Sequence, residues 1–253
     1  MENPRLVTKL DGSKKKKCET HGEYMATSYK MFSDKVYWTN CPKCDKEFQD
    51  KADEFDRKQL EQQRERLLIA IGISKRFTNA TLENYKPVNK KASENLKIIK
   101  SYCDNFKEIV KNGSSLILCG TPGTGKTHLA CAMTIKLTDL KYPSYYTTSY
   151  KMMSRIKATY GKYAEEIEQN VLHKLITSKL LIIDEIGVQF GSDAEKVLFY
   201  QIINGRYDNI LPTVLISNLT VKELVEFIGD RCFDRLKEGS GVVLSFDWDS
   251  YRK

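Results

Sequence analysis

The stretch GTPGTGKTHLA, residues 120–130, combines glycine, lysine and threonine at the spacing of a phosphate-binding loop. Its glycines permit backbone angles that turn successive N–H groups toward phosphate oxygens. Lys126 can then reach the β- and γ-phosphates of a nucleoside triphosphate, and the hydroxyl group of Thr127 can bind Mg²⁺. A chance glycine turn is a poor alternative, because an apolar strand pattern precedes the loop and a helical pattern follows it. The residues expected to hold the nucleotide are Gly120, Thr121, Pro122, Gly123, Thr124, Gly125, Lys126, Thr127 and His128.

A pair of carboxylates follows the apolar run LLII at residues 180–183. Asp184 would emerge at the carboxyl end of a buried strand, where ligands bind in open α/β sheets. There it can hold Mg²⁺ through water, and Glu185 can orient and polarise an attacking water. The pair could instead be ordinary polarity at a strand end, but the upstream phosphate-binding loop favours a catalytic role. A second carboxylate indicates water as the nucleophile, and therefore hydrolysis rather than phosphoryl transfer to a metabolite.

Asn218 and two arginines are weaker candidates for the same chemistry. Asn218 ends the apolar run TVLIS and would lie beside Asp184 in the sheet, although asparagine is also a common turn residue. Arg231 and Arg235 lie one helical turn apart and share a face. Fixed guanidinium charges suit the oxygens of a phosphoryl transition state. Surface salt bridging is the alternative interpretation for both arginines.

Two short cysteine and histidine pairs near the N-terminus predict a metal site. Cys18 and His21 form a C-x-x-H pair, and Cys41 and Cys44 form a C-x-x-C pair. Residues at these spacings can converge on one ion from two tight turns, and four protein ligands complete a tetrahedral Zn²⁺ site of the structural kind. So small a segment buries little apolar surface, and a bound metal would therefore be needed to stabilise its fold. The other cysteines, which we expect to be buried packing residues, are Cys103, Cys119, Cys131 and Cys232.

Apolar strand patterns alternate with helical patterns from about residue 77, which predicts an α/β domain with a five-stranded parallel sheet flanked by helices. The predicted strands are SLILCG, SYYTTS, KLLIIDEIG, PTVLISN and GVVLSFDW. Before this domain, residues 45–73 are dense in charge and carry only a sparse apolar stripe, which predicts a solvated connecting helix. We therefore expect a zinc module at residues 1–45, a charged helical linker at 46–75 and an ATPase domain at 76–253.

Composition limits the classes of partner and compartment. The chain has 253 residues, a net charge of +8 and a pI of about 9.0. This excess of positive charge favours a polyanionic partner such as nucleic acid, with simple solubility as the alternative. No apolar run approaches the length of a membrane span, and the N-terminus lacks the apolar core of a signal peptide. We expect a cytoplasmic protein with no membrane partner, in which clustered cysteines bind metal rather than form disulfides.

Four stretches together resemble one family: GTPGTGKTHLA, LLIIDEIGVQ, GDRCFDRLK and the ending FDWDSYRK. They are similar to the bacterial helicase loader DnaC and its DnaI- and IstB-like relatives, a family within the AAA+ ATPases. The resemblance covers roughly residues 77–253. It implies an ATPase centre made by Lys126, Thr127, Asp184 and Glu185, with Asn218 as the sensor on the fourth strand.

The resemblance also implies roles for Arg235, for Arg252 and for a DNA-binding insertion. Arg235 looks like the finger that acts on the ATP of an adjacent protomer, and Arg252 looks like the second sensor of its own chain. Residues 150–169 occupy the position of the helical insertion that holds single-stranded DNA, and residues 77–85 would lie near adenine. Positive charge interleaved with aromatic rings suits phosphate and base contacts, whereas a solvated helix with buried tyrosines is the alternative. The insertion offers Arg155, Lys157, Tyr160 and Lys162.

The resemblance predicts an ATP-dependent replication factor of bacterial or phage origin. It would bind a DnaB-like hexameric helicase through residues 1–45, associate with itself when ATP is bound, and place the helicase on single-stranded DNA. The rival prediction is an IstB-like ATPase that regulates a transposase on duplex DNA. A DNA-binding module with vestigial ATPase motifs is disfavoured, because Lys126, Asp184 and Glu185 are all present.

Overall fold

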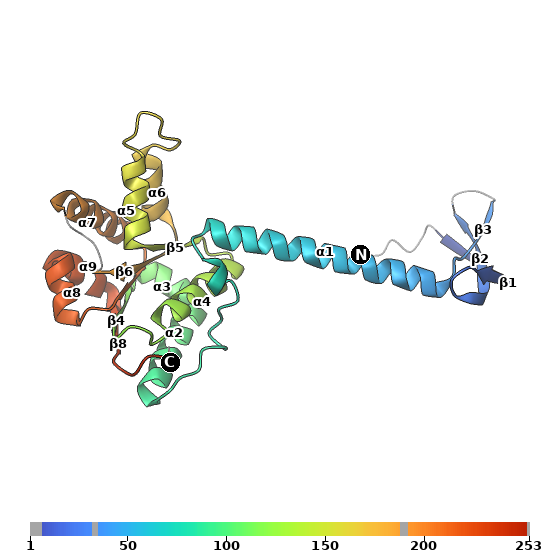
Figure 1. The fold of residues 1–253 in the computed structure, drawn as a ribbon, viewed down its shortest axis with the longest axis horizontal. Helices are drawn as coiled ribbons and strands as arrows, with labels where there is room; N and C mark the ends of the chain where they lie inside the picture. Colours follow the sequence, from blue (N-terminus) through green and yellow to red (C-terminus); the bar gives the residue numbers. More distant parts are fainter. Residues whose placement is uncertain (1–6, 32–34, 188–191, 252–253) are drawn as a thin grey trace. The chain divides into compact units, whose positions relative to one another are not determined.

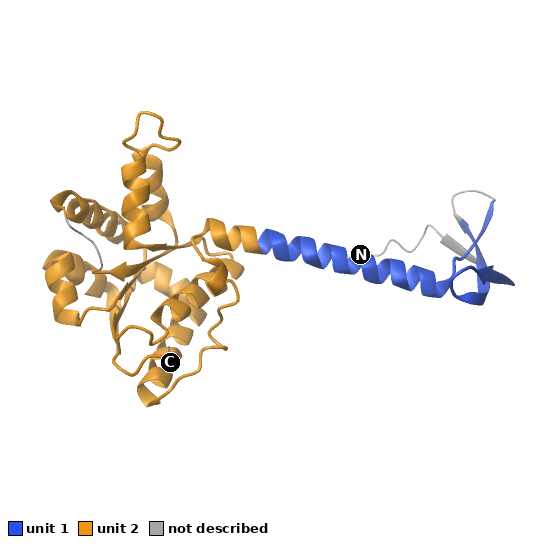
Figure 2. Cartoon of the chain, viewed as in Figure 1, with its two compact units in different colours: residues 1–64 blue, residues 65–253 orange. Residues whose placement is uncertain are grey.

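The computed structural model describes residues 7–31, 35–187 and 192–251, and the chain divides into two compact units. Unit 1 comprises Met1–Arg64 and unit 2 comprises Glu65–Lys253 (Figure 2). Arg252, the expected second sensor, lies outside the described residues. Among the described helices, none is both long enough and apolar enough to cross a membrane.

Unit 2 is built on a five-stranded parallel sheet, which confirms the predicted α/β class. The strand order is β5-β6-β7-β4-β8, so β4, which precedes the phosphate-binding loop, lies between β7 and β8. Figure 1 shows helices on both sides of these strands. The strands other than β5 are nearly continuous apolar runs because helices cover both faces of the sheet, whereas β5 has the sequence SYYTT. The strands are β4 (Leu116–Gly120), β5 (Ser144–Thr148), β6 (Leu180–Ile186), β7 (Thr213–Ser217) and β8 (Val242–Phe246).

Two separate hydrophobic cores lie on the two faces of this sheet. Alternate residues of a strand point to opposite faces, so Leu116 and Leu118 pack in one core while Ile117 and Cys119 pack in the other. The first core takes in helices α2 (Lys90–Asp104), α3 (Phe106–Asn112) and α4 (Lys126–Asp139). The second takes in α5 (Ser149–Ala158), α6 (Glu168–Thr177), α7 (Asp193–Asp208), α8 (Val221–Ile228) and α9 (Asp230–Lys237).

Short 3₁₀ turns occur at η1 (Lys75–Phe77) and η2 (Glu238–Ser240). The four cysteines expected to be packing residues are all buried in these cores.

A fully buried arginine joins α6, α7 and β7. Arg206 has no exposed surface, and its guanidinium group donates hydrogen bonds to backbone carbonyl groups in place of a carboxylate. Its acceptors are the carbonyl oxygens of Leu175, Ile176, Ser178 and Pro212 and the hydroxyl oxygen of Thr213. Buried carbonyl groups are costly when unpaired, so this side chain stabilises the ends of α6 and β7 together.

Unit 1 contains a three-stranded antiparallel sheet that the sequence analysis did not identify. Its strands are β1 (Val7–Cys18), β2 (Gly22–Met31) and β3 (Val36–Trp38), in that spatial order. Gly22 adopts a φ of 77° at the turn between β1 and β2, a conformation that favours glycine. The lysine run at residues 14–17 lies within β1. Helix α1 (Pro42–Ala70) covers most of the segment predicted to be a charged linker, and of its residues only Leu68 is buried. The boundary between the two units falls within this helix, after Arg64.

Candidate nucleotide site and metal centre

The phosphate-binding loop connects the carboxyl end of β4 to the N-terminus of α4, as in a nucleotide-binding α/β sheet. Gly123 and Gly125 have φ values of 78° and 90°. A Cβ atom at Gly125 would lie 2.5 Å from the ring of Tyr85, and one at Gly123 would clash with Ser250. Both the backbone angles and the available space therefore require glycine at these two positions.

Lys126 points back into the loop that precedes it. Its Nζ donates hydrogen bonds to the carbonyl oxygens of Gly120 and Thr121, each at 2.7 Å. The side chain is only 5% exposed, and burial lowers the pKa of Lys126 to about 8. The carbonyl oxygens accept hydrogen bonds from the ammonium group but do not neutralise its positive charge. Phosphate oxygens would accept the same hydrogen bonds and also neutralise the charge, so this lysine is well suited to bind a triphosphate.

Asp184 is the centre of the hydrogen-bond network in the site. It is 3% exposed, and its Oδ2 accepts hydrogen bonds from Thr127 Oγ1 at 2.7 Å and from the hydroxyl group of Tyr146 at 2.8 Å. Its Oδ1 accepts a bond from the backbone N–H of Glu185 at 2.7 Å. Thr127 and Asp184, the two residues expected to hold Mg²⁺, are thus brought into direct contact. A magnesium ion prefers such oxygen ligands.

Tyr146 is a site residue that the sequence analysis missed. It lies on β5, two residues before the end of that strand, and it is 8% exposed. Burial, followed by the charge of Asp184, raises the pKa of Tyr146 far above its usual value, so the phenol remains a hydrogen-bond donor. Nothing near it in the sequence identifies the partner, because Asp184 is 38 residues away.

Glu185 is exposed between two buried neighbours, Asp184 and Ile186. Its φ of 59° is unusual for a residue other than glycine, and the pairing of β6 with β7 shifts register at this point. The Ser149 hydroxyl donates to its carbonyl oxygen at 2.9 Å and supports this turn. Strained backbone of this kind is common where a side chain must face a ligand, and Glu185 lines the same cleft as Lys126.

The cleft has a volume of about 510 Å³ and joins the predicted catalytic residues to an aromatic pocket. Asn218, directly after β7, lies on its wall. At the other end, the ring of Tyr85 lies 6.1 Å from that of His128 and 5.9 Å from that of Tyr251, the last in an edge-on contact. These rings offer a stacking surface for a purine base. Tyr85 belongs to the 77–85 stretch expected near adenine, while Tyr251 was not anticipated.

Arg235 does not reach the cleft of its own chain. Its guanidinium group lies over the rings of Tyr200 and Tyr207, with its central carbon 4.8 and 5.5 Å from the ring centres. It lines a different pocket together with Ser115 and Thr213, at the amino ends of β4 and β7. The phosphate-binding loop follows the opposite end of β4. Arg231, one turn earlier on α9, is exposed.

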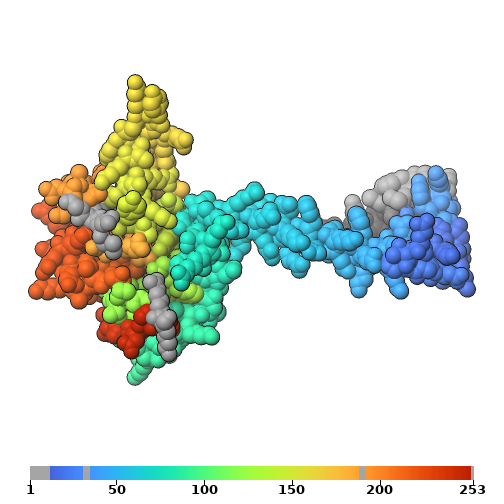
Figure 3. Space-filling model, viewed as in Figure 1, coloured from blue at the N-terminus to red at the C-terminus, as the bar shows by residue number. Residues whose placement is uncertain are grey.

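The predicted DNA-binding residues lie on the hairpin formed by α5 and α6, which projects from the rest of unit 2 (Figure 3). Arg155 makes a two-pronged ion pair with Glu166 at 2.7–3.0 Å, and Lys157 pairs with Glu195 at 2.7 Å. Tyr160 is 61% exposed. Lys162 is exposed too. Two of the four residues are therefore engaged by carboxylates, and the tip of the hairpin offers the other two to solvent.

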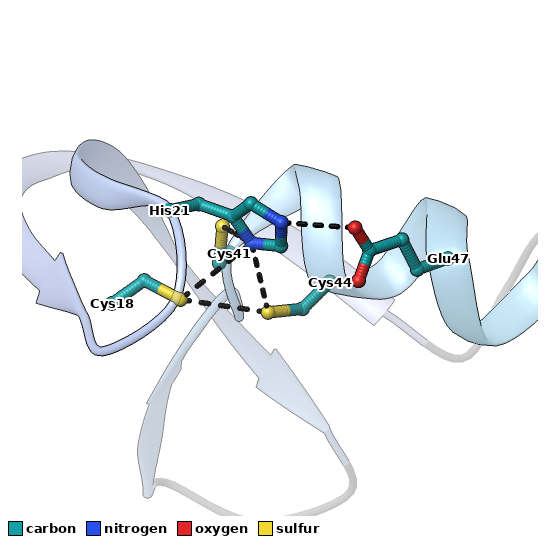
Figure 4. Close-up of polar contacts among 5 residues, drawn as sticks. All are labelled: Cys18, His21, Cys41, Cys44 and Glu47. Carbon is teal, nitrogen blue, oxygen red and sulfur yellow. Dashed lines mark hydrogen bonds and ion pairs between the residues drawn. The ribbon is translucent and has the colours of Figure 1, made fainter.

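The four predicted zinc ligands converge on one point in unit 1 (Figure 4). Their ligand atoms all lie within 4.8 Å of one another. Nδ1 of His21 is 3.3 Å from Cys44 Sγ, 3.7 Å from Cys41 Sγ and 3.8 Å from Cys18 Sγ. A tetrahedral zinc site with ordinary bond lengths needs separations of about 3.6–3.8 Å between its ligand atoms. The geometry therefore fits Zn²⁺.

Two further contacts prepare these ligands for a metal. Nε2 of His21 lies 3.0 Å from a carboxylate oxygen of Glu47, an outer contact that fixes the ring orientation of metal-bound histidines. Backbone hydrogen bonds from His21 and Thr20 lower the pKa of Cys18 to about 6, which favours the thiolate form that metals require, while the hydrogen bond with Cys18 raises the pKa of Cys44. The sequence analysis did not single out Glu47, although it lies one helical turn after Cys44.

Comparison with known proteins gives consistent matches. The family described as IstB-like ATP binding protein matches residues 45–253. The replicative helicase loader DnaC of Buchnera aphidicola subsp. Schizaphis graminum is 37% identical over 189 residues, which cover 75% of this chain and 76% of that protein. DnaC of Escherichia coli K12 is 35% identical over 181 residues, or 72% of each chain. A crystal structure of the DnaC helicase loader superposes with a TM-score of 0.61 at 25% identity, covering 68% of this chain and 99% of the other.

Replacing Tyr146 with phenylalanine should weaken Mg²⁺ binding in the presence of ATP by about tenfold or more, as loss of an outer-shell hydrogen bond typically does. The ring and its packing are retained, so ATP affinity without Mg²⁺ should not change. Magnesium titration followed by calorimetry measures both quantities. Tyr145→Phe is the matched control, because the hydroxyl group of Tyr145 contacts Arg155 instead. Equal magnesium affinity in Tyr146→Phe and the unchanged protein would contradict the role given to Tyr146.

Proposed function

The chain belongs to the family of IstB-like ATP-binding proteins, and from this premise we propose that it is an ATPase that loads a replicative helicase onto single-stranded DNA in the bacterial cytoplasm. The observation that carries the proposal is the contact of Thr127 with Asp184, next to the phosphate-binding loop. Its curated relatives carry the name of replicative helicase loader at 35–37% identity. Helicase loading in DNA replication is therefore the role that its relatives support.

We assign the steps of ATP hydrolysis to residues of the cleft. The loop and Lys126 would bind the phosphates, while Thr127 and Asp184 would hold Mg²⁺, which supplies charge neutralisation at the phosphates when bound. Glu185 would orient the attacking water and accept its proton. Asn218 would contact the γ-phosphate or that water. The cleft alone offers no free guanidinium group from α9, because Arg235 lies at the other end of the sheet.

The position of Arg235 supports a site completed by a second copy of the chain. An arginine finger can act in trans on the phosphate of a neighbour. ATP binding would then favour self-association, and hydrolysis would loosen it and release the loader. The same arrangement explains why Arg235 is held over two tyrosine rings and not over its own phosphate-binding loop.

The test for this shared site is a mixing experiment. Arg235→Ala should retain ATP binding but lose hydrolysis by about a thousandfold, as loss of an arginine finger does. Lys126→Ala should fail to bind ATP. A mixture of the two should regain part of the activity, since each variant supplies what the other lacks. Arg231→Ala, one turn away and exposed, is the control. Full hydrolysis by Arg235→Ala as an isolated monomer would rule out the shared site.

The α5–α6 hairpin is our proposed contact with single-stranded DNA. Tyr160 would stack on a base and Lys162 would neutralise a phosphate. Arg155 and Lys157 would support the hairpin through their ion pairs with Glu166 and Glu195. The competing function is regulation of a transposase on duplex DNA. The IstB-like family match is compatible with it, whereas the 35–37% identity with DnaC loaders favours helicase loading.

The helicase assignment is tested by mass measurement of the full chain mixed with the hexameric helicase of its host, with and without ATP. We expect a complex that forms in one nucleotide state and transfers the helicase to single-stranded DNA. Glu185→Gln should bind ATP and the helicase but fail to release, because hydrolysis is blocked. No complex in any nucleotide state, together with preferential binding of long duplex DNA, would favour the transposase regulator.

We propose that Cys18, His21, Cys41 and Cys44 bind one structural Zn²⁺, and that this module contacts the helicase. Elemental analysis of the purified chain should find one zinc ion per chain. Cys44→Ser should abolish zinc binding, because the site cannot reach four ligands without it. Lys43→Ala, at the exposed neighbouring position, should leave the zinc content unchanged. Zinc-free protein with an unaltered structure after chelation would exclude the site.

A further inference from the structure

Unit 1 presents a face of its small sheet that combines tyrosine rings with lysines. In β1 and β2, Lys15 lies opposite Met25, and in β2 and β3, Tyr29 lies opposite Tyr37. Opposed residues of antiparallel strands point to the same face, as do alternate residues of one strand. Lys17 therefore shares this face with Lys15. We call the surface formed by Lys15, Lys17, Met25, Tyr29 and Tyr37 the tyrosine face.

The described residues of unit 1 pack on the other face of the sheet. Ala26 is fully buried and Ser28 is 3% exposed, and the ring of Trp38 lies opposite Ser28 in register. On the tyrosine face, in contrast, Met25 is 53% exposed and Tyr37 is 37% exposed. The tyrosine face is therefore the more open face of the sheet, with Tyr37 exposed and Tyr29 half-buried.

The two rings on this face form a stacking platform. The centroids of Tyr29 and Tyr37 are 5.8 Å apart, with an interplanar angle of 25°. The Nζ atom of Lys35 lies 5.9 Å from the centroid of Tyr37. Lys15 and Lys17 are exposed on the neighbouring strand. Exposed rings that accept unpaired bases, together with cations that follow a phosphate backbone, are the two components of single-strand binding surfaces.

Charge favours a polyanion on this face. Residues 12–40 contain six lysines and three acidic residues. Glu23, which lies opposite Lys17, adds a negative charge beside these lysines. Lysines beside stacked rings are the pairing that binds a phosphate backbone together with its bases. A duplex hides the faces of its bases, whereas a single strand exposes them to the tyrosine rings.

We propose that the tyrosine face binds single-stranded nucleic acid, with a base stacked on Tyr29 and Tyr37 and phosphates bound by Lys15, Lys17 and Lys35. This site is distinct from the α5–α6 hairpin of unit 2, and it lies outside residues 45–253 that match the family. It does not depend on ATP or on the helicase. Unit 1 would then provide a second binding site for single-stranded DNA.

The test uses the full zinc-loaded chain and a fluorescein-labelled oligothymidine, followed by fluorescence anisotropy without nucleotide. All variants carry Tyr160→Ala and Lys162→Ala, so that the hairpin does not mask the effect. Adding Tyr29→Ala and Tyr37→Ala should weaken binding at least fivefold, the low end of the loss per stacked base. Tyr37→Phe keeps the ring and should keep the affinity. Lys15→Ala with Lys17→Ala should reduce the slope of log affinity against log salt by about 1.4.

Phe48→Ala provides the matched control, because Phe48 is a 76% exposed aromatic residue of unit 1 on α1 and not on the sheet. Zinc content must remain unchanged in every variant, which excludes unfolding of the module. Equal affinity of the Tyr29/Tyr37 variant and its parent would overturn the proposal. So would loss of helicase capture with DNA affinity intact, because the face would then be a protein interface. If the full chain bound no helicase but the Tyr29/Tyr37 variant still lost DNA affinity, the loader function would be excluded and DNA binding by the tyrosine face would be supported.

Discussion

The buried carboxylate of Asp184 is the interaction on which the arrangement of unit 2 depends. A charge this deeply buried is costly unless hydrogen bonds and a partner cation compensate it. The donors come from three directions, since Thr127 belongs to α4, Tyr146 to β5 and the N–H of Glu185 to the following residue. The parallel sheet, with β5 beside β6 and β4 beyond β7, brings these donors to the carboxyl end of β6. The same geometry turns Glu185 out of the sheet toward the cleft.

The two ends of the sheet in unit 2 carry different functional groups. The carboxyl ends of the strands hold the cleft, whereas the amino ends of β4 and β7 lie beside Arg235. These two ends are separated by the length of a strand, so Arg235 lies away from the phosphate-binding loop of its own chain. Under the function proposed above, a site divided in this way would make hydrolysis depend on assembly. The contacts of Arg235 with Tyr200 and Tyr207 hold the guanidinium group in a defined place on the surface that a neighbour would meet.

The sequence was informative where one segment carries its own signal. All five strands of unit 2 could be predicted, because four are apolar runs and β5 is rich in aromatic and β-branched residues. The clustering of Cys18, His21, Cys41 and Cys44 could be anticipated because each pair is local, while zinc binding there stays a prediction. The partners of Tyr146 and Arg206 could not be predicted, since their contacts join distant segments. For the same reason the carboxylates that engage Arg155 and Lys157 were missed. The sheet of unit 1 was missed because a strand containing four successive lysines lacks the alternating apolar pattern.

The small sheet of unit 1 has few large side chains on its buried positions and can be stabilised by a metal. The buried positions of β2 hold the small side chains of Ala26 and Ser28, which bury little apolar surface and contribute little to stability. A metal bound by residues of the β1–β2 turn and of the segment that enters α1 can supply that stability. Tyr24 and Trp38 lie on the packed face and are half-buried. Half-buried Tyr29 and exposed Tyr37 lie on the opposite face beside lysines, where the proposed ligand would use both rings.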